Sequence, residues 1–166
     1  MYGGIDLAAK VENGTGVSTL SSHGIKSATV FAEKAIIKKM GECSVIAIDA
    51  PLSRTEKPFR EAERELMSEF GSILPLNTPG MKSLSKRAVR LRKKLERKTS
   101  AVVIETYPRA VEKVLSVNRK MLDADFKNEH EYDAYLCAVA AKKYDENMYE
   151  EFGKAKETII LPLSEE

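Results

Sequence analysis

The sequence predicts an α/β domain with a mixed sheet and helices on both of its faces. Two apolar runs, VIAID at 45–49 and AVVIE at 101–105, are typical of strands that are buried on both faces of a parallel sheet. A hairpin signal near the N-terminus supplies antiparallel strands, and segments with helical periodicity separate the later strands. A hairpin followed by alternating helices and strands is the order expected of such a sheet.

The elements can be predicted in chain order. They are strands at 3–8 and 16–22 around the turn ENGTG, a helix at 28–40, a strand at 44–49, helical sequence within 54–71, a proline-bearing loop at 74–80, a basic helix at 82–98, a strand at 101–105, a helix at 109–115, a helix at 128–144 and a strand at 158–162. Ser27 is the expected cap of the first helix and Gly41 its stop, while Pro108 is expected to start the short helix after the strand at 101–105.

Length and composition set limits on the class of protein. The chain of 166 residues predicts a single domain over 1–166, with a helical insertion at about 52–98. It contains no apolar run of the roughly 20 residues that a membrane span needs, and its start lacks the basic residues of a signal peptide. Cys43 and Cys137 form no CxxC pair, which favours a reduced, cytoplasmic chain without a zinc site.

The segment 82–98 concentrates positive charge. It carries nine Lys and Arg against one Glu, although the net charge of the whole chain is only +2. Apolar residues at helical spacing form one stripe, namely Leu84, Ala88, Leu91 and Leu95. Basic residues lie off that stripe, namely Arg87, Arg90, Lys94 and Lys98. The segment is either an ordinary solvated helix face or a surface that binds phosphates.

Acidic residues follow three of the predicted strands. Asp6, Asp49 and Glu105 each lie near the carboxyl end of a strand, and ligands of open α/β sheets bind beyond those ends. Strand alternation separates Asp6 from Ile5 and Leu7, and the two aspartates and Glu105 are expected to face one crevice. Each acid could also cap a turn or a helix, or pair with a base such as Arg109. Three acids crowded together repel, however, so a bound cation explains them better.

A fourth candidate acid lies on the helix HEYDAYLCAVAA. His130 and Asp133 are three residues apart and share one face, which continues with small residues at Ala134, Cys137 and Ala141. Small residues allow a helix to approach a sheet closely, which would bring Asp133 down to the strand ends. The alternative is that His130 and Asp133 only decorate the start of the helix, where Asp is favoured.

These features together resemble a known superfamily. Six pieces occur in family order between residues 3 and 162, namely GIDLA, IAIDAPLS, GMKSLSKRAVRLRKKL, VIETYPRA, HEYDAYLCAVAA and IILP. The chain resembles an uncharacterised family of predicted nucleases with the ribonuclease H-like fold, and its helix motif resembles that of the RuvC-type resolvases. The resemblance implies hydrolysis of phosphodiester bonds with Mg²⁺ or Mn²⁺, and it places Asp6, Asp49 and Asp133 at the positions of metal ligands. His130 matches the extra helix position of the resolvases, and Glu105 is expected in the same catalytic set.

The expected partner is nucleic acid, of a type that the sequence leaves open, and a homodimer is also left open. The expected phosphate contacts are the basic residues Arg60, Arg64, Arg87, Arg90, Lys94, Lys98 and Arg109. Ribonucleases H carry a Glu on the first helix, for which only Glu33 is available here. The competing interpretations are a nucleic-acid-binding module that does not cleave, a phosphotransferase relative with an actin-like fold, and a scaffold protein.

Overall fold

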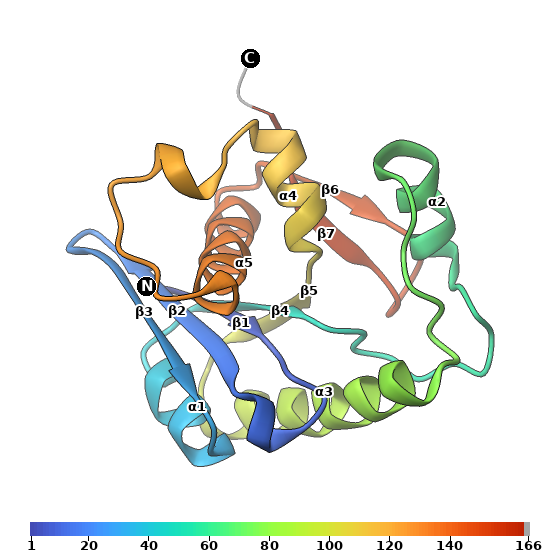
Figure 1. The fold of residues 1–166 in the computed structure, drawn as a ribbon, viewed down its shortest axis with the longest axis horizontal. Helices are drawn as coiled ribbons and strands as arrows, with labels where there is room; N and C mark the ends of the chain where they lie inside the picture. The colour runs from blue at the N-terminus through green and yellow to red at the C-terminus, as the bar shows by residue number, and fades with distance from the viewer. Residues whose placement is uncertain (165–166) are drawn as a thin grey trace.

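The structure, a computed structural model, describes residues 1–164 and forms a seven-stranded mixed sheet in the order β3-β2-β1-β4-β5-β7-β6 (Figure 1). Strands β1, β4, β5 and β7 are parallel, and β2 and β6 run antiparallel to their neighbours. The strands are β1 (Tyr2–Asp6), β2 (Thr15–Ser21), β3 (Gly24–Val30), β4 (Val45–Asp49), β5 (Val102–Glu105), β6 (Tyr149–Phe152) and β7 (Ile159–Pro162). The helices are α1 (Glu33–Met40), α2 (Glu61–Phe70), α3 (Pro79–Lys98), α4 (Pro108–Leu115) and α5 (Glu129–Asp145), with short 3-10 turns η1 (Val11–Asn13) and η2 (Arg119–Met121).

The α/β class and the N-terminal antiparallel hairpin agree with the sequence prediction, but two strands were not predicted. Strand β3 includes residues 28–30, which were assigned to the start of a helix, and α1 begins only at Glu33, with Ala32 at its N-cap. Ser27 therefore caps no helix. Its hydroxyl instead donates to the Ser18 hydroxyl on the adjacent strand at 2.9 Å. Strand β6 was also missed, and it pairs with β7 as a C-terminal hairpin.

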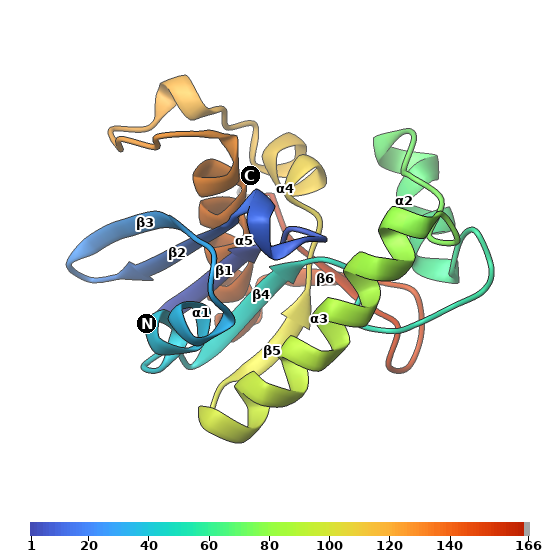
Figure 2. The same cartoon turned by 60° about the horizontal axis from the view of Figure 1, so that its bottom comes forward.

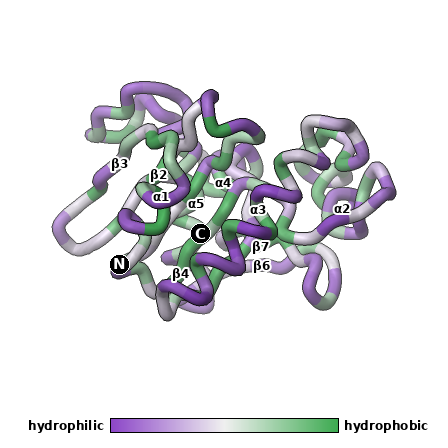
Figure 3. The backbone as a smooth tube through the Cα atoms, turned by 90° about the horizontal axis from the view of Figure 1, so that it is seen from below, coloured by the Kyte–Doolittle hydropathy of each residue, from purple (hydrophilic) through white to green (hydrophobic). Residues whose placement is uncertain are grey.

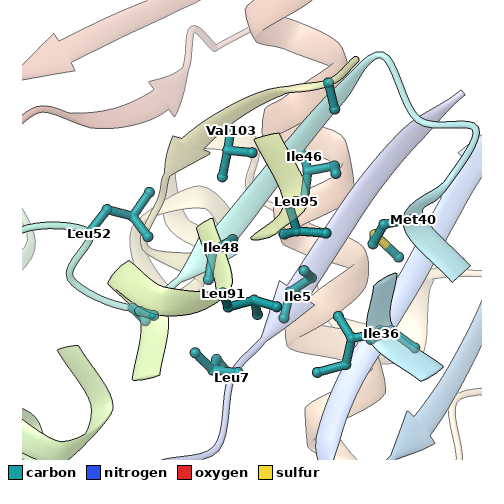
Figure 4. Close-up of a cluster of buried hydrophobic side chains, with 14 of the residues drawn as sticks. Ile5, Leu7, Ile36, Met40, Ile46, Ile48, Leu52, Leu91, Leu95 and Val103 are labelled. Atoms are coloured by element: carbon teal, nitrogen blue, oxygen red, sulfur yellow. The ribbon is translucent and has the colours of Figure 1, made fainter. Parts of the chain in front are cut away.

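One face of the sheet is covered by α1 and α3. The predicted stripe of α3 packs there, with Leu91 and Leu95 fully buried against Ile5 and Ile48 (Figure 4). Fully burying a leucine or isoleucine side chain contributes about 1.5–3 kcal/mol, so this layer is a main source of stability. Helix α3 crosses the sheet obliquely, and its N-terminal end extends beyond the sheet toward α2 (Figure 2).

The opposite face is covered by α5, which approaches the strands unusually closely. A Cβ atom added at Gly4 would lie 1.9 Å from the carbonyl oxygen of Ala134 and 2.4 Å from the backbone nitrogen of Ala138. No real Cβ atom tolerates these distances, so glycine on β1 is what allows α5 to rest on the strand. Cys137 completes the contact, and its thiol lies 3.7 Å from the carbonyl oxygen of Ile5.

Helices α2 and α4 pack at the β6–β7 end of the molecule. Leu66 of α2 and Val111 of α4 belong to one apolar cluster with Phe152 and Leu161 of the terminal hairpin. In Figure 3 the apolar segments gather along the central strands, whereas hydrophilic backbone prevails toward the outer loops. Across residues 1–164, none of the helices combines the length and the apolar character that crossing a bilayer requires.

Candidate active site

Two of the predicted acids lie side by side at the end of the central strands. Asp6 is the last residue of β1 and Asp49 the last residue of β4, and the two are direct partners in the parallel pair. Because partners in register point to the same face, both side chains lie on the face covered by α5. The apolar strand 45–49 is buried up to Ile48, so it fixes the position of Asp49 rigidly.

Helix α5 brings the other two predicted residues to this edge. Its N-terminus is capped by Asn128, whose side chain accepts from the backbone of Glu131 at 3.0 Å. Gly16 on β2 lies directly under the helix, because an added Cβ would be 1.9 Å from the His130 carbonyl oxygen. His130 Nδ1 lies 2.6 Å from Asp6 Oδ2, and the Asp133 side chain is only 13% exposed. Asp133 thus faces the strand ends and not the solvent.

The pKa values of the acids in the cluster are raised mainly by burial and, to a smaller extent, by their mutual repulsion. Burial raises the pKa of Asp49 well above its usual range, and the negative charges of Asp6 and Asp133 raise it further. Burial also raises the pKa of Asp133 to about 6, in spite of Arg109, whose guanidinium lies 3.7 Å away. The pKa of Asp6 is raised by burial, although the contact with His130 acts in the opposite direction. The three carboxyl groups therefore interact as one cluster.

The chemistry of this cluster suits a hard divalent cation. Three carboxylates supply oxygen ligands, and Asp133 Oδ1 is a buried acceptor with no hydrogen-bond partner. As the side chains stand, no three His, Cys, Asp or Glu residues within 1–164 are close enough together to hold one ion. Asp6 is turned to His130 instead. Metal binding would therefore require the side chains of the cluster to move closer together.

Glu105 is engaged in a different interaction. It is the partner of Ile48 in the β4–β5 pair, so its side chain leaves the sheet on the face opposite to Asp49. Its carboxylate accepts from Arg60 Nη1 at 3.1 Å and from the backbone of Leu52 at 2.8 Å. Arg60 also pairs with Glu63, and all three charged residues are buried. Glu105 thus fixes the segment after β4, and its partner is Arg60 and not Arg109.

This placement corrects part of the predicted nucleic-acid surface. Arg60 cannot contact phosphates, because its guanidinium is buried between two glutamates. Arg87 is buried as well, and it donates to the Ala8 carbonyl oxygen. Arg90 and Lys94 both pair with Glu33, which also explains why Glu33 of α1 does not join the acidic cluster.

Four of the predicted basic residues are exposed, namely Arg64, Arg90, Lys98 and Arg109. Of these four, Arg109 reaches the acidic cluster. The exposed side of α3 also carries Lys86, Lys93 and Arg97, which were not singled out from the sequence. Their spacing of seven and four residues would have indicated this second stripe.

A cavity adjoins the acids. It has a volume of about 240 Å³, and the three strand acids predicted to face one crevice, Asp6, Asp49 and Glu105, all line it. Its other walls come from α2, from the connection between α2 and α3, from the start of α3 and from Tyr107 after β5. The sequence did not predict these walls, since the connection LPLNTPG carries only turn signals. The two leucines of this connection could have indicated the wall, because a fully solvated loop is usually polar.

A comparison of the chain with models of known protein families, with curated proteins and with solved structures finds no match.

Proposed function

We propose that the protein is a metal-dependent nuclease that hydrolyses phosphodiester bonds, with Asp6, Asp49, Asp133 and His130 as its catalytic residues. The single observation that carries the proposal is the juxtaposition of Asp6 and Asp49 as register partners, with Asp133 of α5 facing them. Carboxylates gather in this way mainly where a cation compensates their repulsion.

The architecture supports the same proposal. An N-terminal antiparallel hairpin continues into parallel strands, and α5 covers the face on which the acids lie. This is the arrangement that the resemblance to ribonuclease H-like nucleases implies. The order of the acids along the chain, strand, strand and then late helix, agrees with that resemblance too.

The roles follow from the chemistry of the side chains. Asp6, Asp49 and Asp133 would hold Mg²⁺ or Mn²⁺, and such ions activate water and neutralise the charge that develops on the phosphate. His130 is 54% exposed at the edge of the cluster, so its ring can exchange a proton with a water molecule beside the phosphate. Arg109 is positioned at Asp133 and offers a guanidinium to a non-bridging phosphate oxygen.

The test is a cleavage screen over single-stranded, duplex, hybrid and branched substrates, with Mg²⁺ and with Mn²⁺. Cleavage should require the ion and should be lost in Asp49→Asn. Asp125→Asn, which alters an exposed acid away from the cluster, should cleave like the wild type. Binding of Mn²⁺, measured by calorimetry in the absence of substrate, should weaken in Asp49→Asn and not in Asp125→Asn.

Two results would contradict the proposal. One is cleavage that persists in a chelator, and the other is Mn²⁺ binding that is the same in the wild type and Asp49→Asn. Nucleic-acid binding without any cleavage would favour the second candidate, a binding module on the same fold. The observation in favour of that candidate is that no three potential ligands within residues 1–164 are close enough for one ion as they stand.

A further inference from the structure

The cavity beside the acids is lined by two kinds of side chain. Four are acidic, namely Asp6, Asp49, Glu63 and Glu105, and a phosphate would react beside Asp6 and Asp49 under the proposed function. Most of the others are apolar and include Leu66 of α2, Leu76 of the α2–α3 connection and Leu84 of α3. Helix α2, the α2–α3 connection and the N-terminal end of α3 lie beyond the carboxyl ends of the central strands (Figure 2).

The negative charge of the lining argues against a cavity that binds phosphate groups directly. No Lys or Arg is among the described residues that line the cavity, and its acids would repel a phosphate that entered without a cation. Leu74, which also lines the cavity, is 70% exposed, so its apolar side chain is open to a ligand. The apolar side chains of the lining therefore suit the part of a nucleotide that carries no charge.

The volume of the cavity limits the size of the ligand that it can hold. Pockets for drug-sized ligands measure about 300–1,000 Å³, and this cavity of about 240 Å³ is smaller. It suits a single ring system and not a longer segment. Tyr107 contributes an aromatic ring to the lining, and stacking of a base on an aromatic side chain contributes about 1–3 kcal/mol.

We propose that the cavity holds one unpaired nucleobase next to the reacting phosphate, so that the substrate is single-stranded nucleic acid or a duplex with an unpaired nucleotide. This inference rests on the proposed function. In an intact duplex the bases are paired and stacked, so the apolar side chains of the cavity would face only the charged phosphate backbone. They would remove water from the phosphates without offering hydrogen bonds or charges in its place. An unpaired base can leave the stack and bury its faces against Tyr107 and the leucines.

The test compares two ligands with identical phosphates. One duplex carries a single-nucleotide bulge, and the other carries the same bulge without its base. Binding is measured by fluorescence anisotropy in Ca²⁺, a hard cation that carboxylates bind and that offsets their repulsion of the phosphates, and gels establish that both ligands stay intact. The wild type should bind the bulge with its base about 5- to 150-fold more tightly, which is the stacking energy expressed as an affinity ratio.

The variant Leu74→Ser should reduce this preference at least about twofold, because it removes apolar surface that the base would cover. Leu74 is exposed, so the fold should tolerate the change. Met121→Ser is the matched control, since Met121 is 65% exposed and lies outside the cavity. It should keep the full preference.

The outcomes separate the two proposals. Equal affinity for the two bulges, or a preference that Leu74→Ser leaves intact, overturns the inference about the base, even if cleavage is observed. Absence of binding to either ligand overturns it as well. A clear preference for the base without cleavage of any substrate supports this inference and contradicts the proposed nuclease activity.

Discussion

Replacing Asp133 with asparagine should stabilise the protein at neutral pH and not in acid. The folded protein raises the pKa of this carboxyl from 3.8 to about 6, chiefly by burial. A raised acid pKa means that the unfolded chain loses its proton first, so stability is full below about pH 4 and falls as the pH rises to about 6. A difference of about two pKa units corresponds to about 3 kcal/mol, which we reduce to about 2 kcal/mol because solvent reaches part of the side chain. Asparagine avoids this cost because it is neutral at every pH.

The assay is urea unfolding at about pH 4 and about pH 7.5 in a chelator. The free energy of unfolding of Asp133→Asn should exceed that of the wild type by about 2 kcal/mol at the higher pH and should equal it at the lower one. The control Asp125→Asn changes an exposed acid and should differ from the wild type by less than about 0.5 kcal/mol at both. A gain of the same size at both pH values would refute the reasoning, since it would not arise from ionisation. Absence of any gain in stability at either pH would mean that ionisation of Asp133 does not destabilise the folded protein.

Three further changes test other parts of the structure. Gly4→Ala should lower the free energy of unfolding in urea by about 3 kcal/mol or more, because the new methyl group meets the α5 backbone, whereas Gly80→Ala, in open space on α3, should be neutral or stabilising. An equal effect of both substitutions would show that α5 is not in close contact with β1. Arg60→Met should cost about 3–5 kcal/mol, since it leaves two glutamates buried without their partner, and a thermal midpoint like that of the wild type would argue against the buried ion pairs. Under the proposed function, the double variant Lys93→Ala and Arg97→Ala should reduce the slope of log affinity for nucleic acid against log salt concentration by about 1.4–1.8, without lowering the thermal midpoint. An unchanged slope would mean that the exposed side of α3 does not bind phosphates.

Much of the fold could be predicted because its signals are local. The buried strands at 45–49 and 102–105 follow from uninterrupted apolar runs, and the stripe of α3 follows from helical spacing. Strand β3 was missed because Ser27 is as suitable for a helix cap as for a cross-strand hydrogen bond, and only its pairing with β2 decides between them. Tertiary pairing overrode local preference there.

The candidate site was predictable to the extent that it depends on strand ends. Asp6 and Asp49 were placed at one edge because each lies near the carboxyl end of a predicted strand, and the structure makes them register partners. The environment of Glu105 could not be predicted, because the face it occupies depends on a register that one residue of slip would reverse. Arg60 reaches Glu105 from a distant segment, and no local pattern encodes that contact.

The two glycines under α5 also bear on how a mutational scan of this protein should be interpreted. Gly4 and Gly16 lie on strands next to the acids, and neither leaves room for even a methyl group. Under the proposed function, a scan for lost activity would find both positions as intolerant as the carboxylates, although glycine offers no ligand, proton or charge. A stability measurement run in parallel would separate the two kinds of intolerance, because variants of the proposed catalytic acids would lose activity while remaining folded. At these two positions the chain contributes to the site by the absence of a side chain.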